Sequence, residues 1–197
     1  MFTQLRFPPG TDVESFLASY WQRRPLPMPQ ALPGFSSPLD AEELAGLACE
    51  PELESRLILE RDGEHPWEVR HGPLAMSDFA ELPPSHWTLL VQDVDKFLPA
   101  VAELLSAFGF LPGWRVDDIM VSFAADKGSV GPHLDEYDVF LIQAEGRRRW
   151  RIDPIPGPNG PVIPDIDLRI LQRFEPREEY LMKPGDVLYL PPGIPPW

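Results

Sequence analysis

Prolines are spread along this whole chain, and they limit the length of any helix or strand that it can form. There are 26 in 197 residues, whereas an average protein has about 5% proline. Proline breaks the interior of a helix and removes a backbone donor from a strand. These prolines separate apolar runs rather than gathering in one low-complexity tract. The sequence therefore predicts many short elements joined by fixed turns.

The excess of acidic over basic residues indicates which kinds of macromolecule this chain can bind. With 17 basic and 31 acidic residues the formal net charge is −14, while 43% of the residues are hydrophobic, enough for a globular domain with its own core. Because a nucleic-acid surface must be basic, we expect no direct nucleic-acid ligand and instead a basic protein partner. The single cysteine, Cys49, excludes an intrachain disulfide. Without a signal-like or membrane-spanning apolar run, the sequence predicts a cytoplasmic protein that makes no membrane contact.

Apolar periodicity predicts a few helices and many strands. A T-D-V-E capping-box pattern at 11–14 begins a first helix, and further helices are predicted at about 40–49 and 94–108. A proline-rich arm at 25–34 is predicted to be extended. Strands are predicted at 55–61, 67–74, 87–93, 118–125, 138–143, 147–152, 168–174 and 186–190. This pattern favours an antiparallel sandwich or barrel, all-β with helical additions.

His133 and Asp135 are the first candidate site. On an extended backbone, residues two apart project from the same face, so this imidazole and carboxylate can converge. They are two parts of the 2-His-1-carboxylate set that holds non-haem Fe(II). A surface hydrogen-bonding pair is the alternative. The preceding glycine-rich turn, G-S-V-G-P, allows the backbone to approach a ligand closely.

Arginines follow on the next predicted strand. Arg147, Arg149 and Arg151 alternate with other residues, as on a solvated face. An arginine that points inward instead can bind a small dicarboxylate through two parallel hydrogen bonds. A metal with an inward arginine is the minimum for a 2-oxoglutarate oxygenase.

The run DDIMVSFAADKGSVGPHLDEYDVFLIQAEGRRRWRI, followed by KPGDVLYLPPGIP, resembles the JmjC-type ribosomal oxygenases of the cupin-4 group, and most of all their bacterial members. The resemblance is strong over 114–195 and looser over SYWQRRPL. It implies a double-stranded β-helix, or jelly roll, and an Fe(II)- and 2-oxoglutarate-dependent hydroxylase that acts on an arginine of a large-subunit ribosomal protein. By position, His133 and Asp135 match two metal ligands, and Arg148 matches the arginine that binds the far carboxylate of 2-oxoglutarate.

The resemblance also implies a pocket for the substrate arginine, lined by Asp118, Met120 and Tyr137. A guanidinium needs a carboxylate and an apolar wall, which these side chains supply. The alternatives are that Asp118 is a turn residue and that Met120 is plain core.

Pro196 departs from the family pattern, which has the third metal ligand, a histidine, at this position. Proline cannot bind iron, and the remaining histidines, His65, His71 and His86, lie upstream of the ligand pair. We therefore expect either an incomplete metal site or a sequence that is altered or truncated at this position, and a jelly roll that is C-terminally truncated. The predicted organisation is a helical N-terminal part with the arm over 1–52 and the jelly roll over 53–197, with an inserted helix near 94–108. The family's oligomerisation and winged-helix-like parts are then absent, and the full-length protein is expected to be a homodimer.

Pro196 also favours a second class of function, a catalytically silent jelly roll that holds a basic protein segment. A metal-independent cupin that binds a sugar or small acid is a third interpretation.

Overall fold

The computed structural model describes residues 4–60, 67–155 and 160–197. It divides the chain into two compact units. The first unit comprises Pro38–Val130 and Asp165–Leu168, and the second comprises the residues up to Ser37, Gly131–Pro164 and Arg169–Trp197. Each unit has its own antiparallel strands, so the predicted all-β class with helical additions is confirmed. The predicted boundary near residue 52 stays a prediction.

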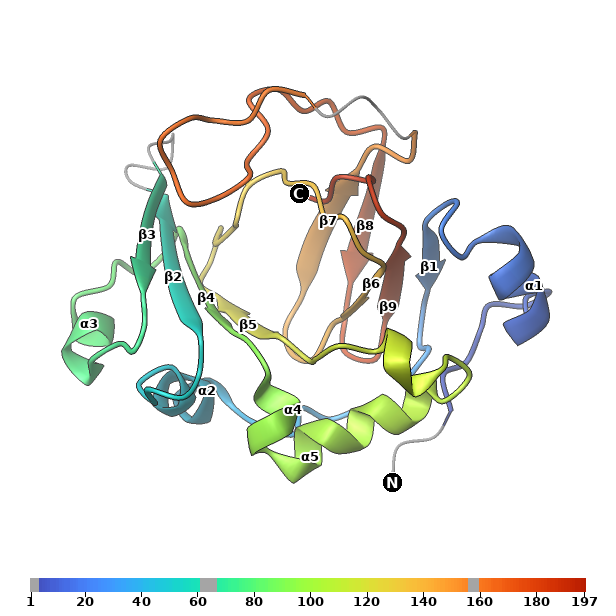
Figure 1. The fold of residues 1–197 in the computed structure, drawn as a ribbon, viewed down its shortest axis with the longest axis horizontal. Helices are drawn as coiled ribbons and strands as arrows, with labels where there is room; N and C mark the ends of the chain where they lie inside the picture. The colour runs from blue at the N-terminus through green and yellow to red at the C-terminus, as the bar shows by residue number, and fades with distance from the viewer. Residues whose placement is uncertain (1–3, 61–66, 156–159) are drawn as a thin grey trace. The chain divides into compact units, whose positions relative to one another are not determined.

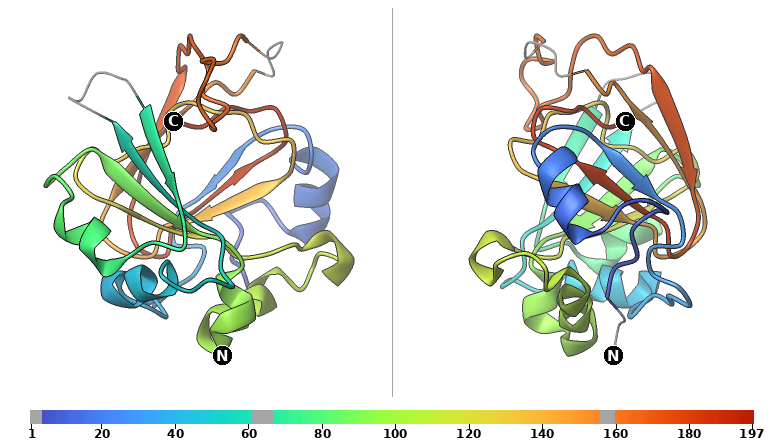
Figure 2. Two further views of the ribbon diagram at one scale, coloured as in Figure 1. Left: turned by 60° about the vertical axis from the view of Figure 1, so that its left-hand side comes forward. Right: turned by 90° about the vertical axis from the view of Figure 1, so that its right-hand side faces the viewer.

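The first unit contains a four-stranded sheet in the order β3-β2-β4-β5. Its strands are β2 (Ser55–Glu60), β3 (Trp67–His71), β4 (Trp87–Val91) and β5 (Val121–Ala124). Figure 1 and Figure 2 show β2, β3 and β4 side by side. Leu57 pairs with Leu89 across the centre of the sheet, and both side chains are buried. Four predicted strands are thus confirmed, although residue 61 lies outside the described residues.

Short helices complete the first unit. They are α2 (Ala41–Leu47), α3 (Met76–Ala80), α4 (Val94–Phe97), α5 (Pro99–Ala102) and the 3-10 helices Glu103–Phe108 and Gly113–Arg115. Asp40 caps α2, because its Oδ1 accepts from the backbone N–H groups of Glu42 and Glu43, each at 2.9 Å. Leu44 of α2 joins Leu57 and Leu89 in the buried core of this unit.

The prediction of one continuous helix over 94–108 is wrong. Leu98 has an extended backbone, with φ −115° and ψ 107°, and it separates α4 from α5. The cause is Pro99, whose ring disfavours helical geometry at the preceding residue. Pro99 then occupies the first turn of α5, where its missing N–H costs nothing.

The second unit contains a three-stranded sheet and a two-stranded pair. The sheet has the order β1-β9-β6 and the pair is β7 with β8. Their bounds are β1 (Leu26–Met28), β6 (Val139–Ile142), β7 (Arg148–Ile152), β8 (Glu178–Met182) and β9 (Val187–Leu190). The arm predicted at 25–34 does contain an extended segment, because β1 pairs with β9. In Figure 1, β7, β8 and β9 carry the orange and red colours of the C-terminal part of the chain.

The predicted strand over 168–174 is wrong. Only isolated bridges form there, from Ile170 to His133 and from Leu171 to Val162. The regular strand is instead β8, where Leu181 is 60% exposed and two glutamates begin the strand. Such a polar, half-exposed strand lacks the apolar alternation by which strands are predicted.

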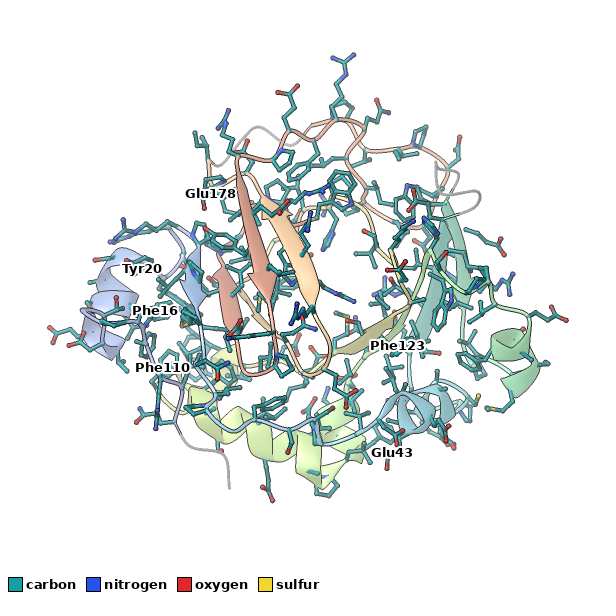
Figure 3. All side chains as sticks on the ribbon, turned by 180° about the vertical axis from the view of Figure 1, so that it is seen from behind. Phe16, Tyr20, Glu43, Phe110, Phe123 and Glu178 are labelled. Carbon is teal, nitrogen blue, oxygen red and sulfur yellow. The ribbon has the colours of Figure 1, made fainter. Side chains whose placement is uncertain are left out.

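An aromatic cluster joins the N-terminal helix α1 (Val13–Ser19) to the sheet of the second unit. Asp12 caps this helix by accepting from Ser15 N at 2.8 Å, so the cap lies one residue later than the T-D-V-E pattern suggests. The ring of Phe16 is fully buried and lies 5.0 Å from the ring of Tyr189, centroid to centroid. Figure 3 labels Phe16 and Tyr20 on this segment. Among the described residues no helix is long and apolar enough to span a membrane.

Candidate functional site

His133 and Asp135 lie together in the second unit. His133 Nε2 is 3.5 Å from Asp135 Oδ2, and the two side chains are 24% and 23% exposed. The other ring nitrogen, Nδ1, is 2.9 Å from the carbonyl oxygen of Gly131, which orients the ring with Nε2 toward the carboxylate. Burial acts to lower the pKa of His133, but the hydrogen bond and charge of Asp135 outweigh it, and the pKa is raised overall.

The segment 131–137, called here the ligand loop, is held tightly against Ile170. Gly131 has φ +74°, and a Cβ atom there would lie 2.8 Å from Ile170 Cγ2. The carbonyl oxygen of Pro132 accepts from Leu171 N at 2.7 Å. Glycine is therefore required at 131 both by its backbone conformation and by the close approach of Ile170.

Pro196 lies beside the ligand loop. Its carbonyl oxygen accepts from His133 N at 3.3 Å, and Gly193 N donates to the carbonyl oxygen of Asp135 at 3.0 Å. Backbone hydrogen bonds between Trp197 and Arg151, at 2.6 and 2.7 Å, extend this segment along β7. A side chain at position 196 is thus carried by backbone that directly contacts the first candidate ligand.

The donors suit a divalent metal in type but not in number. An imidazole nitrogen and a carboxylate oxygen are ligands for Fe(II), of which the facial set needs three. In the part of the chain that the structure describes, no three His, Cys, Asp or Glu residues are grouped to hold a metal ion. His71 pairs with Asp167 at 3.0 Å and His86 with Ser85 at 2.7 Å, whereas His65 lies outside the described residues.

Arg148 differs from the other arginines of β7. Arg149 and Arg151 both pair with Glu179, at 3.4 and 3.2 Å. Arg148 is half-buried and makes no ion pair with any described residue, and its guanidinium carbon lies 5.4 Å from the ring centre of Trp150. Burial lowers the pKa of Arg148. Successive residues on a strand face opposite sides, which explains why one arginine is withdrawn from solvent while its neighbours form exposed pairs.

The three predicted pocket residues have different surroundings. Asp118 and Met120 belong to the first unit, and Tyr137 belongs to the second. Asp118 Oδ2 accepts from Asp93 N at 3.0 Å. Met120 and Tyr137 are 43% and 65% exposed, so Met120 is not a core residue. Their grouping around one substrate stays a prediction.

Sequence reasoning assigned no role to Asp138, although the motif H-x-D-x-Y-D-V-F contains it. Its carboxylate accepts from Tyr189 Oη at 2.5 Å and from Gln22 Nε2 at 3.1 Å. The only sequence signal was the presence of a polar residue immediately before an apolar strand. Nothing in the periodicity indicates that its partners lie near opposite ends of the chain.

In a comparison with protein families, residues 103–196 match the family described as JmjC domain. The ribosomal protein uL16 3-hydroxylase of Escherichia coli (strain K12) is 44% identical over 186 residues, covering 91% of this chain and 47% of that protein. The probable ribosomal oxygenase of Haemophilus influenzae is 38% identical over 179 residues, covering 90% and 44%. The chain therefore spans about half the length of these curated relatives.

Solved structures that resemble this chain also include ribosomal oxygenases. One similar structure is that of the ribosomal oxygenase YcfD from Escherichia coli in complex with cobalt and 2-oxoglutarate. The match covers 100% of the present chain and 48% of the YcfD chain, with a TM-score of 0.83 and 40% sequence identity. The complex of YcfD with cobalt and succinic acid matches with a TM-score of 0.82. The predicted JmjC/cupin fold class is thereby confirmed.

Proposed function

The chain belongs to the JmjC family of ribosomal oxygenases, and from that premise we propose that it is the metal- and 2-oxoglutarate-binding part of a hydroxylase that acts on an arginine of a large-subunit ribosomal protein. His133 and Asp135 would hold the iron, and Arg148 would bind the far carboxylate of 2-oxoglutarate. When bound, iron and 2-oxoglutarate supply the oxidising power that hydroxylates a C–H bond with molecular oxygen.

Arg148 carries this proposal. A half-buried guanidinium that has no carboxylate partner among the described residues is costly unless a ligand supplies the anion. A small dicarboxylate fits, because the planar fork of arginine binds a carboxylate through two parallel hydrogen bonds. The neighbouring Arg149 and Arg151 already have Glu179 and do not need an external anion.

Substitution of Arg148 tests the cosubstrate assignment. We expect Arg148→Gln to weaken 2-oxoglutarate binding roughly 10- to 100-fold, since a hydrogen bond to a charged group contributes about 1.5–3 kcal/mol. Isothermal titration calorimetry with Mn(II) and no oxygen measures this. Arg149→Gln is the matched control and should bind as the parent does. Equal affinities in parent, Arg148→Gln and Arg149→Gln would contradict the assignment.

The substrate side of the proposal comprises Asp118, Met120 and Tyr137, which would contact the arginine to be oxidised. The net charge of −14 supports a basic ribosomal segment as substrate, because opposite charge speeds the encounter of two proteins. Assembly of the longer protein into a homodimer and location in the cytoplasm belong to the same proposal. Turnover of 2-oxoglutarate with Fe(II) and arginine-containing ribosomal peptides tests it, and no turnover with any such peptide would count against it.

A catalytically silent module that binds a basic protein segment is the second candidate, and Pro196 favours it. In the described residues no three His, Cys, Asp or Glu side chains are grouped to hold a metal ion. His133 and Asp135 alone would hold it, and a site with fewer ligands holds its metal less tightly.

A metal titration separates the two candidates. We expect Pro196→His to increase the affinity for Mn(II) at least tenfold, because the backbone of residue 196 already contacts His133. Pro192→His, in the same turn, is the control and should leave the affinity unchanged. If the unsubstituted parent already binds Mn(II) tightly, a ligand at position 196 is not needed for metal binding, and the silent module loses its support. Equal, weak binding in all three proteins would show that more than this ligand is missing.

A further inference from the structure

A hydrogen-bond network in the second unit has no role in the function proposed above. It joins Gln22, Asp138 and Tyr189, and it is called here the Asp138 network. Tyr189 Oη donates to Asp138 Oδ1 at 2.5 Å, Gln22 Nε2 donates to Asp138 Oδ2 at 3.1 Å, and Gln22 N donates to Tyr189 Oη at 2.7 Å. Each carboxylate oxygen of Asp138 therefore has its own donor, and the tyrosine hydroxyl both donates and accepts.

Both donors of the network are held firmly. The side chain of Tyr189 is fully buried on β9, where burial raises the pKa of its hydroxyl and the bond to Asp138 adds to this effect, so the hydroxyl stays protonated and able to donate. The indole of Trp21 stacks on the ring of Tyr189 with centroids 5.7 Å apart. Gln22 has φ +55°, a left-handed conformation that is unfavourable for a residue with a side chain. Such a conformation persists only where its surroundings enforce it.

Asp138 lies where the ligand loop ends and β6 begins. It is the third residue after Asp135, so a displacement of its backbone shifts the Asp135 carboxylate relative to His133. The rest of the loop has other attachments, since Glu136 pairs with Arg169 at 2.8 Å and Asp135 O accepts from Gly193 N at 3.0 Å. Of these three attachments, the Asp138 network is the one that includes a residue of the N-terminal segment, Gln22.

We propose that Asp138 is a positioning residue: held by Tyr189 and Gln22, it fixes the end of the ligand loop so that the side chains of His133 and Asp135 converge. Its effect on metal binding rests on the function proposed above. The N-terminal segment, which carries no candidate ligand, thereby contributes to the geometry of the site.

Tyr189→Phe tests this role because it removes the hydroxyl and keeps the aromatic ring in the cluster. We expect hydrogen–deuterium exchange of the ligand loop in the metal-free protein to accelerate roughly 5- to 10-fold, as the loss of one hydrogen bond predicts. The affinity for Mn(II) should fall by a similar factor. Tyr180→Phe is the matched control: it also removes a hydroxyl from a strand of this unit, one that donates to Glu178 instead. Its loop exchange and Mn(II) affinity should equal those of the parent.

Two substitutions of Asp138 add a graded comparison. Asp138→Asn keeps an acceptor for the tyrosine hydroxyl and should retain more Mn(II) affinity than Asp138→Ala. Loop exchange that is unchanged in Tyr189→Phe would overturn the proposal, and so would faster exchange with unaltered Mn(II) affinity. A parent protein that binds no Mn(II) would count against the proposed function. Loop exchange in the metal-free protein would still decide whether Asp138 fixes the loop.

Discussion

Single residues determine how closely the ligand loop, which carries His133 and Asp135, packs against the residues beneath it. Gly131 is the clearest case, because its positive φ and its contact with the buried Ile170 both exclude a side chain. The sequence indicated a close backbone approach in the G-S-V-G-P turn. It could not indicate that the approaching partner is Ile170, which lies far along the chain, rather than a ligand.

Gly131→Ala is expected to destabilise the protein by about 1–3 kcal/mol through overpacking against Ile170, in addition to the backbone strain. Gly146→Ala is the control that separates these effects, because Gly146 also has a positive φ, +62°, but nothing lies within 4 Å of an added Cβ. Urea unfolding measures both. Equal losses of unfolding free energy in the two variants would show that contact with Ile170 contributes nothing.

At the scale of elements, the sequence predicts what is locally encoded. Short apolar runs located β2 and β4, and the acidic residue Asp40 marked the start of α2. Other elements were missed or wrongly predicted, among them the strand expected over 168–174, where only isolated bridges form. The five-residue helix α3 is too short for a periodic pattern, β8 is held by pairing with β7 rather than by apolar alternation, and Pro99 interrupts a stripe that otherwise reads as one helix.

The turn between β8 and β9 gives a prediction about pH. The buried carboxylate of Asp186 accepts from Gln30 N at 2.8 Å and from Lys183 N at 3.0 Å. Burial acts to raise the pKa of Asp186, but these hydrogen bonds outweigh it and lower the pKa below 3.8. A lowered pKa in the folded state stabilises the protein above the unfolded-state pKa, and the stabilisation is lost as the pH falls through the folded-state value.

We therefore expect the unfolding free energy of the parent to fall more steeply below about pH 4 than that of Asp186→Asn, which cannot ionise. The variant should be less stable than the parent at pH 7, and the difference should shrink as the pH is lowered. Chemical unfolding at a series of pH values measures this. The exposed Asp165→Asn is the control and should follow the parent. A constant difference between parent and Asp186→Asn at all pH values would contradict the explanation.

At the scale of the whole molecule, contacts were predictable where the residues are close in sequence. His133 and Asp135 are two residues apart, and their predicted convergence is observed, although they lie in a loop with an isolated bridge rather than in a regular strand. Their role as metal ligands stays a prediction. The Asp138 network was not predictable, because Gln22 and Asp138 are 116 positions apart and hydrophobic periodicity carries no information about such pairs. For the same reason, the periodicity could not predict which segments form the second unit, in which the N-terminal residues are combined with the C-terminal strands.

The pairing of β1 with β9 has a consequence for biosynthesis. Gln30 and Asp186 are 156 positions apart, and Leu26 is paired with Tyr189. Translation runs from the N-terminus to the C-terminus, so β1 leaves the ribosome long before its partner strand β9. Until then the nascent chain exposes Phe16 and Trp21, whose aromatic neighbours in the folded protein include Tyr189. Contacts this distant in sequence form slowly, so the newly made N-terminal segment must remain soluble, or be held by a chaperone, while it waits for β9.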